Sequence, residues 1–123
     1  MADHPNAALA RSAMDGFNSG NMERMSEFLA DDVVWHEIGR AEPRRGKAEM
    51  ASSLGSPDFE ITAKLHDVVA NDEHVIALVD ATATRNGKTL DYRTAEIMHI
   101  RGGKVTERWA FSDDTAAIVE FFA

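Results

Sequence analysis

Two β-rich runs, residues 75–85 and 89–100, are separated by Asn86-Gly87. This feature constrains the fold most, because an Asn-Gly pair between such runs is the strongest short-range signal for a β-hairpin. The same pattern recurs on both sides, with turn signals at Asn71-Asp72 and Gly102-Gly103 and further β-rich runs at 59–69 and 104–111. The sequence therefore predicts an antiparallel meander of four long strands in the second half of the chain.

The rest of the chain has mainly helical spacing. Apolar residues recur every three or four positions, and helices are predicted over residues 6–18, 22–30 and 47–54 and after Asp113 or Asp114. Asn6 and Asn21 are possible N-caps of the first two helices. The third helix is predicted to end at Gly55-Ser56-Pro57. A short strand is predicted at 33–37, between the second and third helices.

Composition limits the classes of function. A chain of 123 residues is expected to form one domain over residues 1–123. No apolar run approaches the roughly 20 residues that a membrane span needs. Cysteine is absent, and no basic segment followed by an apolar one opens the chain, so a cytoplasmic location is expected. The net charge of −8 would repel nucleic acid, so nucleic-acid binding is not expected.

Four stretches of the chain resemble, in their order and spacing, the NTF2-like superfamily, in particular its SnoaL-like and ketosteroid-isomerase-like branch. They are FNSGNMERMSEFLADDVVWHE, EPRRG, NGKT and IRGGKVTERWAFSDD. The resemblance covers nearly the whole chain. It implies an α+β cone, in which a curved mixed or antiparallel sheet wraps around N-terminal helices, with a short C-terminal helix and a small-molecule pocket at the open end. Such scaffolds serve isomerases, cyclases, hydrolases, dehydratases and non-catalytic binders, so the fold leaves the function open.

Glu37 is the first candidate catalytic residue. It shares a period-two face with Val33 and Trp35. Such a face should pack inward, where a carboxylate is costly unless it is paired, protonated or lining a wet cavity. The resemblance implies that Glu37 takes the place of the isomerases' carboxylate base, which moves a proton on carbon next to a carbonyl. Alternatively, Glu37 pairs with a nearby arginine or faces solvent.

Glu96 is the second candidate acid. The resemblance implies that Glu96 matches the isomerases' protonated acid, which donates to an oxyanion, if the turn at Gly102-Gly103 is one residue shorter here. If no residue is missing, Ala95 takes that place. The isomerases' helix tyrosine falls near Ala13 and Met14, which have no side-chain donor, so steroid isomerisation is not expected. The alternative for Glu96 is a surface carboxylate in a cross-strand pair.

Asp80 and Arg108 are further candidates on the long strands. Aspartate is unfavourable in the middle of a strand, so a pocket position is one interpretation of Asp80, and the resemblance implies that its parity lines the cavity. The other interpretation buries the alternate residues, Val75 to Ala83, and leaves Asp80 wet. Arg108 is expected inside the cone as the partner of an acid or an anionic ligand. An exposed strand arginine is the alternative.

The remaining substrate-binding candidates are apolar or amphipathic, namely Trp35, Tyr92, Phe17 and Met98. A cavity with few acids among such walls suits a small hydrophobic molecule. No cofactor is expected, and no metal, since the histidines lack metal-ligand spacing. The outer face of the sheet is expected to form a homodimer. The leading hypothesis is a cofactor-independent isomerase or cyclase that uses carboxylate acid–base chemistry on a small apolar carbonyl compound. The alternative is a non-catalytic ligand-binding or dimerisation module.

Overall fold

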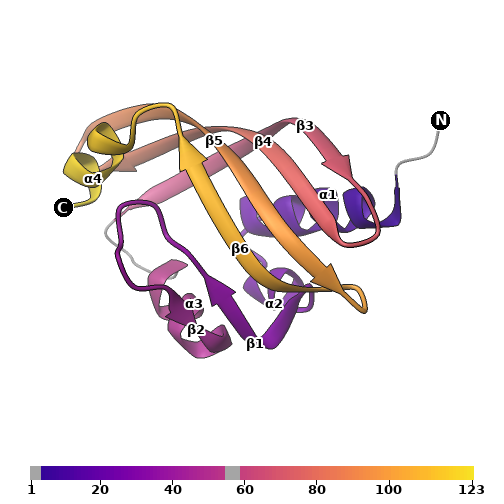
Figure 1. The fold of residues 1–123 in the computed structure, drawn as a ribbon. Helices are drawn as coiled ribbons and strands as arrows, with labels where there is room; N and C mark the ends of the chain where they lie inside the picture. Colours follow the sequence, from indigo (N-terminus) through magenta and orange to yellow (C-terminus); the bar gives the residue numbers. More distant parts are fainter. Residues whose placement is uncertain (1–3, 55–58) are drawn as a thin grey trace.

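The computed structural model describes residues 4–54 and 59–123, so the predicted helix end at Gly55-Ser56-Pro57 lies outside the described residues. The chain has an α+β fold in which a curved six-stranded sheet wraps around the N-terminal helices (Figure 1). In chain order the elements are α1 (Pro5–Asn18), α2 (Met22–Ser26), β1 (Leu29–Trp35), β2 (Arg44–Arg45), α3 (Gly46–Leu54), β3 (Glu60–Ala70), β4 (His74–Arg85), β5 (Lys88–Arg101), β6 (Lys104–Ser112) and α4 (Thr115–Phe122).

The predicted meander is confirmed. The strand order is β2-β1-β6-β5-β4-β3, and β3 to β6 pair antiparallel with their neighbours. Asn86 and Gly87 both have positive φ, of 53° and 76°, as a tight hairpin between twisted strands requires. β1 adds to this meander by pairing parallel to β6.

Two predicted boundaries in the first half were wrong. The second helix ends at Ser26, because Leu29 pairs with Val105 of β6 and is buried with it in one core cluster. The strand consequently runs from Leu29 to Trp35, and Glu37 lies in the loop that follows. Asn21 caps α2 as predicted, with its side chain accepting from Arg24 N at 3.0 Å.

The cap of α1 also differs from the prediction. His4 is the N-cap, and its Nδ1 accepts from Asn6 N at 3.1 Å. Pro5 then takes the first helical position, where its missing N–H costs nothing. The Asn6 side chain instead donates to the carbonyl oxygens of Asn71 and Asp72, which ties the start of α1 to the β3–β4 turn.

The two faces of β4 differ in side-chain size and in polarity. Small side chains are buried on its inner face, namely Val75, Ala77, Val79, Ala81 and Ala83. α1 packs over this face, with Met14 against the cluster of Ala77, Val79 and Ala81. Figure 1 shows α1 beside β3 and β4. The larger Ile76 and Leu78 point to the opposite, outer face.

The outer face of the sheet exposes large apolar side chains, namely Val69, Ile76, Leu78 and Phe111. Register places Val69 beside Ile76, and connects Leu78 through Ala95 to Phe111. A contiguous patch of this kind is typical of an interaction surface. The homodimer expected from the sequence stays a prediction, with this patch as its contact surface. Within the described ranges, no helix combines the length and the apolar character that crossing a bilayer requires.

Gly39 sets how closely the loop after β1 approaches α4. It has φ of +80°, and a Cβ added there would clash with Val119 Cγ2. Gly20 has a similar φ of +75°, but an added Cβ would meet nothing within 4 Å. We expect Gly39→Ala to lower the free energy of unfolding by about 1–3 kcal/mol more than Gly20→Ala, since only the first variant adds overpacking to backbone strain. Urea unfolding of both variants measures the difference, and equal losses would contradict the close contact.

Candidate functional site

The inner face of the sheet, α1 and α4 enclose a cavity of about 650 Å³. Small side chains on β4 create this space, because alanine and valine fill less volume than leucine or phenylalanine. Apolar side chains make up most of the remaining lining, among them Leu9, Met14, Phe17, Phe28, Trp35, Phe59, Met98, Ile118 and Phe122. The volume falls in the range of roughly 300–1,000 Å³ that is typical of small-molecule sites.

A largely buried ion pair joins Glu96 of β5 to Arg108 of β6 on the cavity wall. Glu96 Oε1 accepts from Arg108 Nη2 at 2.6 Å and from Nε at 3.0 Å. The side chains are only 17% and 11% exposed, respectively. Arg108 Nη1 also donates to the His36 carbonyl oxygen at 3.1 Å, and its Cζ lies 4.2 Å from the centroid of the Trp35 ring. The guanidinium is therefore held in one orientation, with its charge inside the cavity.

A second ion pair borders the same indole. Arg44 Nε donates to Glu37 Oε2 at 3.2 Å, and the Glu37 side chain is 34% exposed. Trp35 pairs in register with Arg44 of β2 and with Arg108 of β6, so both arginines flank it. Two carboxylate–guanidinium pairs thus meet around Trp35 in an otherwise mostly apolar cavity, and the Glu37 pair is the more exposed of the two.

Tyr92 of β5 lines the cavity on the same strand face as Glu96. Burial raises the pKa of the Tyr92 hydroxyl above its usual value of 10.0, and the charge of Glu96 raises it further, while that of Arg108 lowers it. The hydroxyl is consequently protonated at neutral pH and available as a hydrogen-bond donor.

Alkaline titration tests this environment, because Tyr92 is the chain's one tyrosine. We expect the tyrosinate absorbance of the native protein to rise with a midpoint above pH 10, and Glu96→Gln to lower that midpoint by removing a charge that opposes ionisation. Because the native pKa exceeds that of the unfolded chain, the hydroxyl's contribution to stability is complete below pH 10 and is lost as the pH rises through the native pKa. A midpoint at or below 10 in the native protein would contradict the burial of Tyr92.

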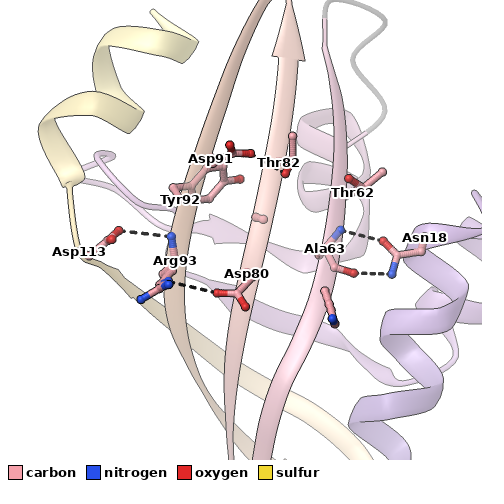
Figure 2. A pocket seen from close by; sticks show the side chains of 11 residues that line it. Asn18, Thr62, Ala63, Asp80, Thr82, Asp91, Tyr92, Arg93 and Asp113 are labelled. Carbon is pink, nitrogen blue, oxygen red and sulfur yellow. Dashed lines mark hydrogen bonds and ion pairs between the residues drawn. The ribbon is translucent and has the colours of Figure 1, made fainter.

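Asp80 does not line this cavity, and the prediction that its parity faces inward was wrong. It lies on the outer face of β4, where its side chain is 48% exposed and its Oδ1 is 3.3 Å from Arg93 Nε. Figure 2 shows this pair in an open polar depression, beside Thr82, Asp91 and Asp113. The physical reason is that the set from Val75 to Ala83 is small and apolar throughout and packs under α1, whereas the alternate set carries Asp80 with Thr82 and Thr84 and faces out.

Beside the same depression, the end of α1 covers the edge strand β3. Asn18, at the end of α1, donates to the Ala63 carbonyl oxygen at 2.6 Å and accepts from Ala63 N at 2.9 Å (Figure 2). These bonds satisfy backbone groups of the edge strand β3 that would otherwise be open to pairing with another chain.

The other candidates from the sequence all line the cavity, namely Glu37, Glu96, Trp35, Tyr92, Arg108, Phe17 and Met98. Glu37 pairs with an arginine, which was one of the alternatives for it. Glu96 also pairs with an arginine on the neighbouring strand, but it does so inside the cavity and not on the surface as the alternative had it. Sequence reasoning missed Arg44 and Thr94, which also line the cavity. Thr94 shares the strand parity of Tyr92 and Glu96, so alternation could have identified it. Arg44 had no such signal, because its place depends on the pairing of β2 with β1.

Comparisons with known proteins agree with the fold and the resemblance. Residues 10–108 match the model of the SnoaL-like domain. The uncharacterized protein Rv0034 of Mycobacterium tuberculosis is 32% identical over 131 residues, covering 100% of both chains. Among solved structures, Bal32a from a soil-derived mobile gene cassette has a TM-score of 0.87 and 28% identity, covering 97% of each chain.

A putative polyketide cyclase from Xanthomonas campestris pv. campestris has a TM-score of 0.80 and 23% identity, covering 94% of this chain and 95% of its own. At that identity the similarity shows a shared fold and no more. The match to the domain model and the relative that aligns over the whole length settle the family. This chain belongs to the SnoaL-like domain family.

Proposed function

We propose that the chain binds a small, mostly apolar carbonyl compound in this cavity and moves a proton at the carbon next to the carbonyl, in the manner of a cofactor-independent isomerase or cyclase. The observation that supports the proposal is the pair of carboxylate–guanidinium contacts around Trp35 in an otherwise mostly apolar cavity. Apolar walls bind the body of such a compound, and the few polar groups fix its orientation.

In this proposal Glu37 is the base. Its carboxylate accepts a proton from the carbon next to the carbonyl, and the electron pair of the broken C–H bond moves to the carbonyl oxygen. Arg44 orients the carboxylate through the contact at 3.2 Å. An isomerase then returns the proton from Glu37 to a different carbon, whereas in a cyclase the carbanion attacks a second carbonyl of the same molecule and the new alkoxide takes the proton.

Arg108 is the proposed donor to the enolate oxygen. Among the described residues its contacts occupy three of the five N–H groups of a guanidinium, which leaves donors for a ligand. Glu96 and Trp35 keep the guanidinium in place, so little reorganisation is needed when negative charge develops on the oxygen.

Exchange of hydrogen for deuterium in 2-tetralone tests the proposal without knowledge of the natural substrate. This ketone has an apolar bicyclic body and acidic C–H bonds next to its carbonyl. We expect the protein in D₂O to accelerate loss of those proton signals, measured by NMR, above the rate in buffer. Tetralin, which has the same skeleton without the carbonyl, should inhibit by occupying the cavity. A rate equal to that in buffer would contradict the proposed proton transfer.

Non-catalytic ligand binding is the second candidate, and one observation favours it. The face of α1 that lines the cavity presents Ala13 and Met14, whose side chains have no hydrogen-bond donor. The isomerases that the chain resembles carry a tyrosine near this position of the helix, and Ala13 and Met14 stand there instead. Binding of 2-tetralone with no acceleration of exchange is the result that this second function predicts.

A further inference from the structure

β5 presents three polar side chains in succession to the cavity, Tyr92, Thr94 and Glu96. Residues two apart on a strand lie on the same face and are separated by about 7 Å. Glu96 is paired with Arg108, whereas the hydroxyls of Tyr92 and Thr94 have no hydrogen-bond partner among the residues that the structure describes. Thr94 is only 8% exposed.

The residues opposite these hydroxyls do not bond to them. Across β4, register places Val79 beside Thr94 and Ala81 beside Tyr92, and both are buried and apolar. Their small size leaves space in front of the two hydroxyls. Across β6, Ser112 lies beside Thr94, but its Oγ donates to the Arg93 carbonyl oxygen at 3.0 Å instead. Neither hydroxyl is sealed from solvent, because Arg85 Nε alone is a buried side-chain atom without a partner among the described residues. Both hydroxyls can therefore donate to, or accept from, a polar group that enters the cavity.

We propose that Tyr92 and Thr94 form a subsite for a second oxygen atom of the ligand. Thr94 and Tyr92 lie one and two same-face positions along β5 from Glu96, whose partner Arg108 binds the carbonyl. The inference rests on the proposed function and narrows the ligand to an elongated apolar ketone with an additional hydroxyl or carbonyl group. Hydroxyls both donate and accept, so they match either group. The charge of Glu96 on the same strand face favours a neutral oxygen group over an anion, and the raised pKa of Tyr92 keeps its hydroxyl neutral.

The test compares two probes, 2-tetralone and 6-hydroxy-2-tetralone, which carries a second oxygen across the ring system. Dissociation constants are measured by calorimetry. We expect the hydroxylated ketone to bind wild-type protein about 3- to 10-fold more tightly, as one added hydrogen bond predicts. Tyr92→Phe and Thr94→Val should bring this ratio close to one, whatever each substitution does to the dissociation constant of 2-tetralone itself.

Thr82→Val is the matched control. Thr82 lies on the outer face of neighbouring β4, where its Oγ1 donates to Asp91 Oδ1 at 2.7 Å, so the same substitution there should leave the ratio unchanged. Labelling the one tyrosine with ¹³C at Cζ gives a direct second readout, since its signal should shift more with 6-hydroxy-2-tetralone than with tetralin.

Two results would overturn the subsite while leaving the proposed function intact, provided 2-tetralone binds. They are equal affinity of wild-type protein for both ketones, and a preference for the hydroxylated ketone that survives both substitutions. Failure of both ketones to bind would contradict the proposed function and the subsite together.

Discussion

Replacing Glu37 by glutamine is expected to lower the rate of deuterium exchange into 2-tetralone by about 10²- to 10⁴-fold, the usual contribution of a general base. The amide keeps nearly the shape of the carboxylate, and its oxygen still accepts from Arg44 Nε, but it cannot accept the proton from carbon. Binding of 2-tetralone should therefore change much less than the exchange rate. NMR measures the exchange rate, and calorimetry measures the binding.

Asp80→Asn is the control for this prediction. It makes the same chemical change in an acid on the outer face of the sheet, away from the cavity lining, so exchange should continue at the wild-type rate. An unchanged rate in Glu37→Gln would remove Glu37 from the mechanism. Equal losses in both variants would instead point to an effect of net charge.

Replacing Arg108 by leucine is expected to lower the free energy of unfolding by up to about 3–5 kcal/mol, the cost of a fully buried pair, because removing one partner leaves a largely buried, uncompensated charge. Glu96 is only 17% exposed and would lose both of its contacts with the guanidinium. The stacking on Trp35 and the bond to the His36 carbonyl would be lost as well. Urea unfolding, with a check that its slope is unchanged, measures the loss.

Two further variants separate charge burial from the loss of contacts. In Glu96→Leu combined with Arg108→Leu no charge is left uncompensated, so most of the lost stability should return. Arg93→Leu breaks the Asp80 pair on the outer face, where the side chains are 80% and 48% exposed, and should cost less than about 1 kcal/mol. Similar losses for Arg93→Leu and Arg108→Leu would contradict the difference in burial between the two pairs.

The elements with local signals were predictable from the sequence. Asn86 and Gly87 both adopt the positive φ that a tight hairpin needs, and the Asn21 side chain caps α2 directly. The parallel pairing of β1 with β6 has no comparable signal, because it joins segments from opposite ends of the chain. That pairing places Arg108 beside Trp35, so the arrangement of the two ion pairs around one indole could not be predicted.

The face of β4 that lines the cavity was ambiguous for a physical reason. The set from Val75 to Ala83 is apolar throughout and the alternate set begins with Ile76 and Leu78, so either set could pack inward, and the resemblance favoured the wrong parity for Asp80. The deciding property is size, because a hollow requires Ala77 and Ala81 on the inner face and places Ile76 and Leu78 outside. The uniformly small and apolar character of alternate residues from Val75 to Ala83 would have been a better guide than the resemblance.

Methyl NMR of the methionines shows whether a ligand enters the interior cavity. Met14 and Met98 line the cavity from α1 and β5, whereas Met22 lies on α2, exposed and outside the lining. With methyl-labelled methionine, saturating 2-tetralone should shift the Met14 and Met98 signals and leave the Met22 signal in place. A bound ketone that leaves Met14 and Met98 unshifted would place the ligand elsewhere and contradict its binding in the cavity.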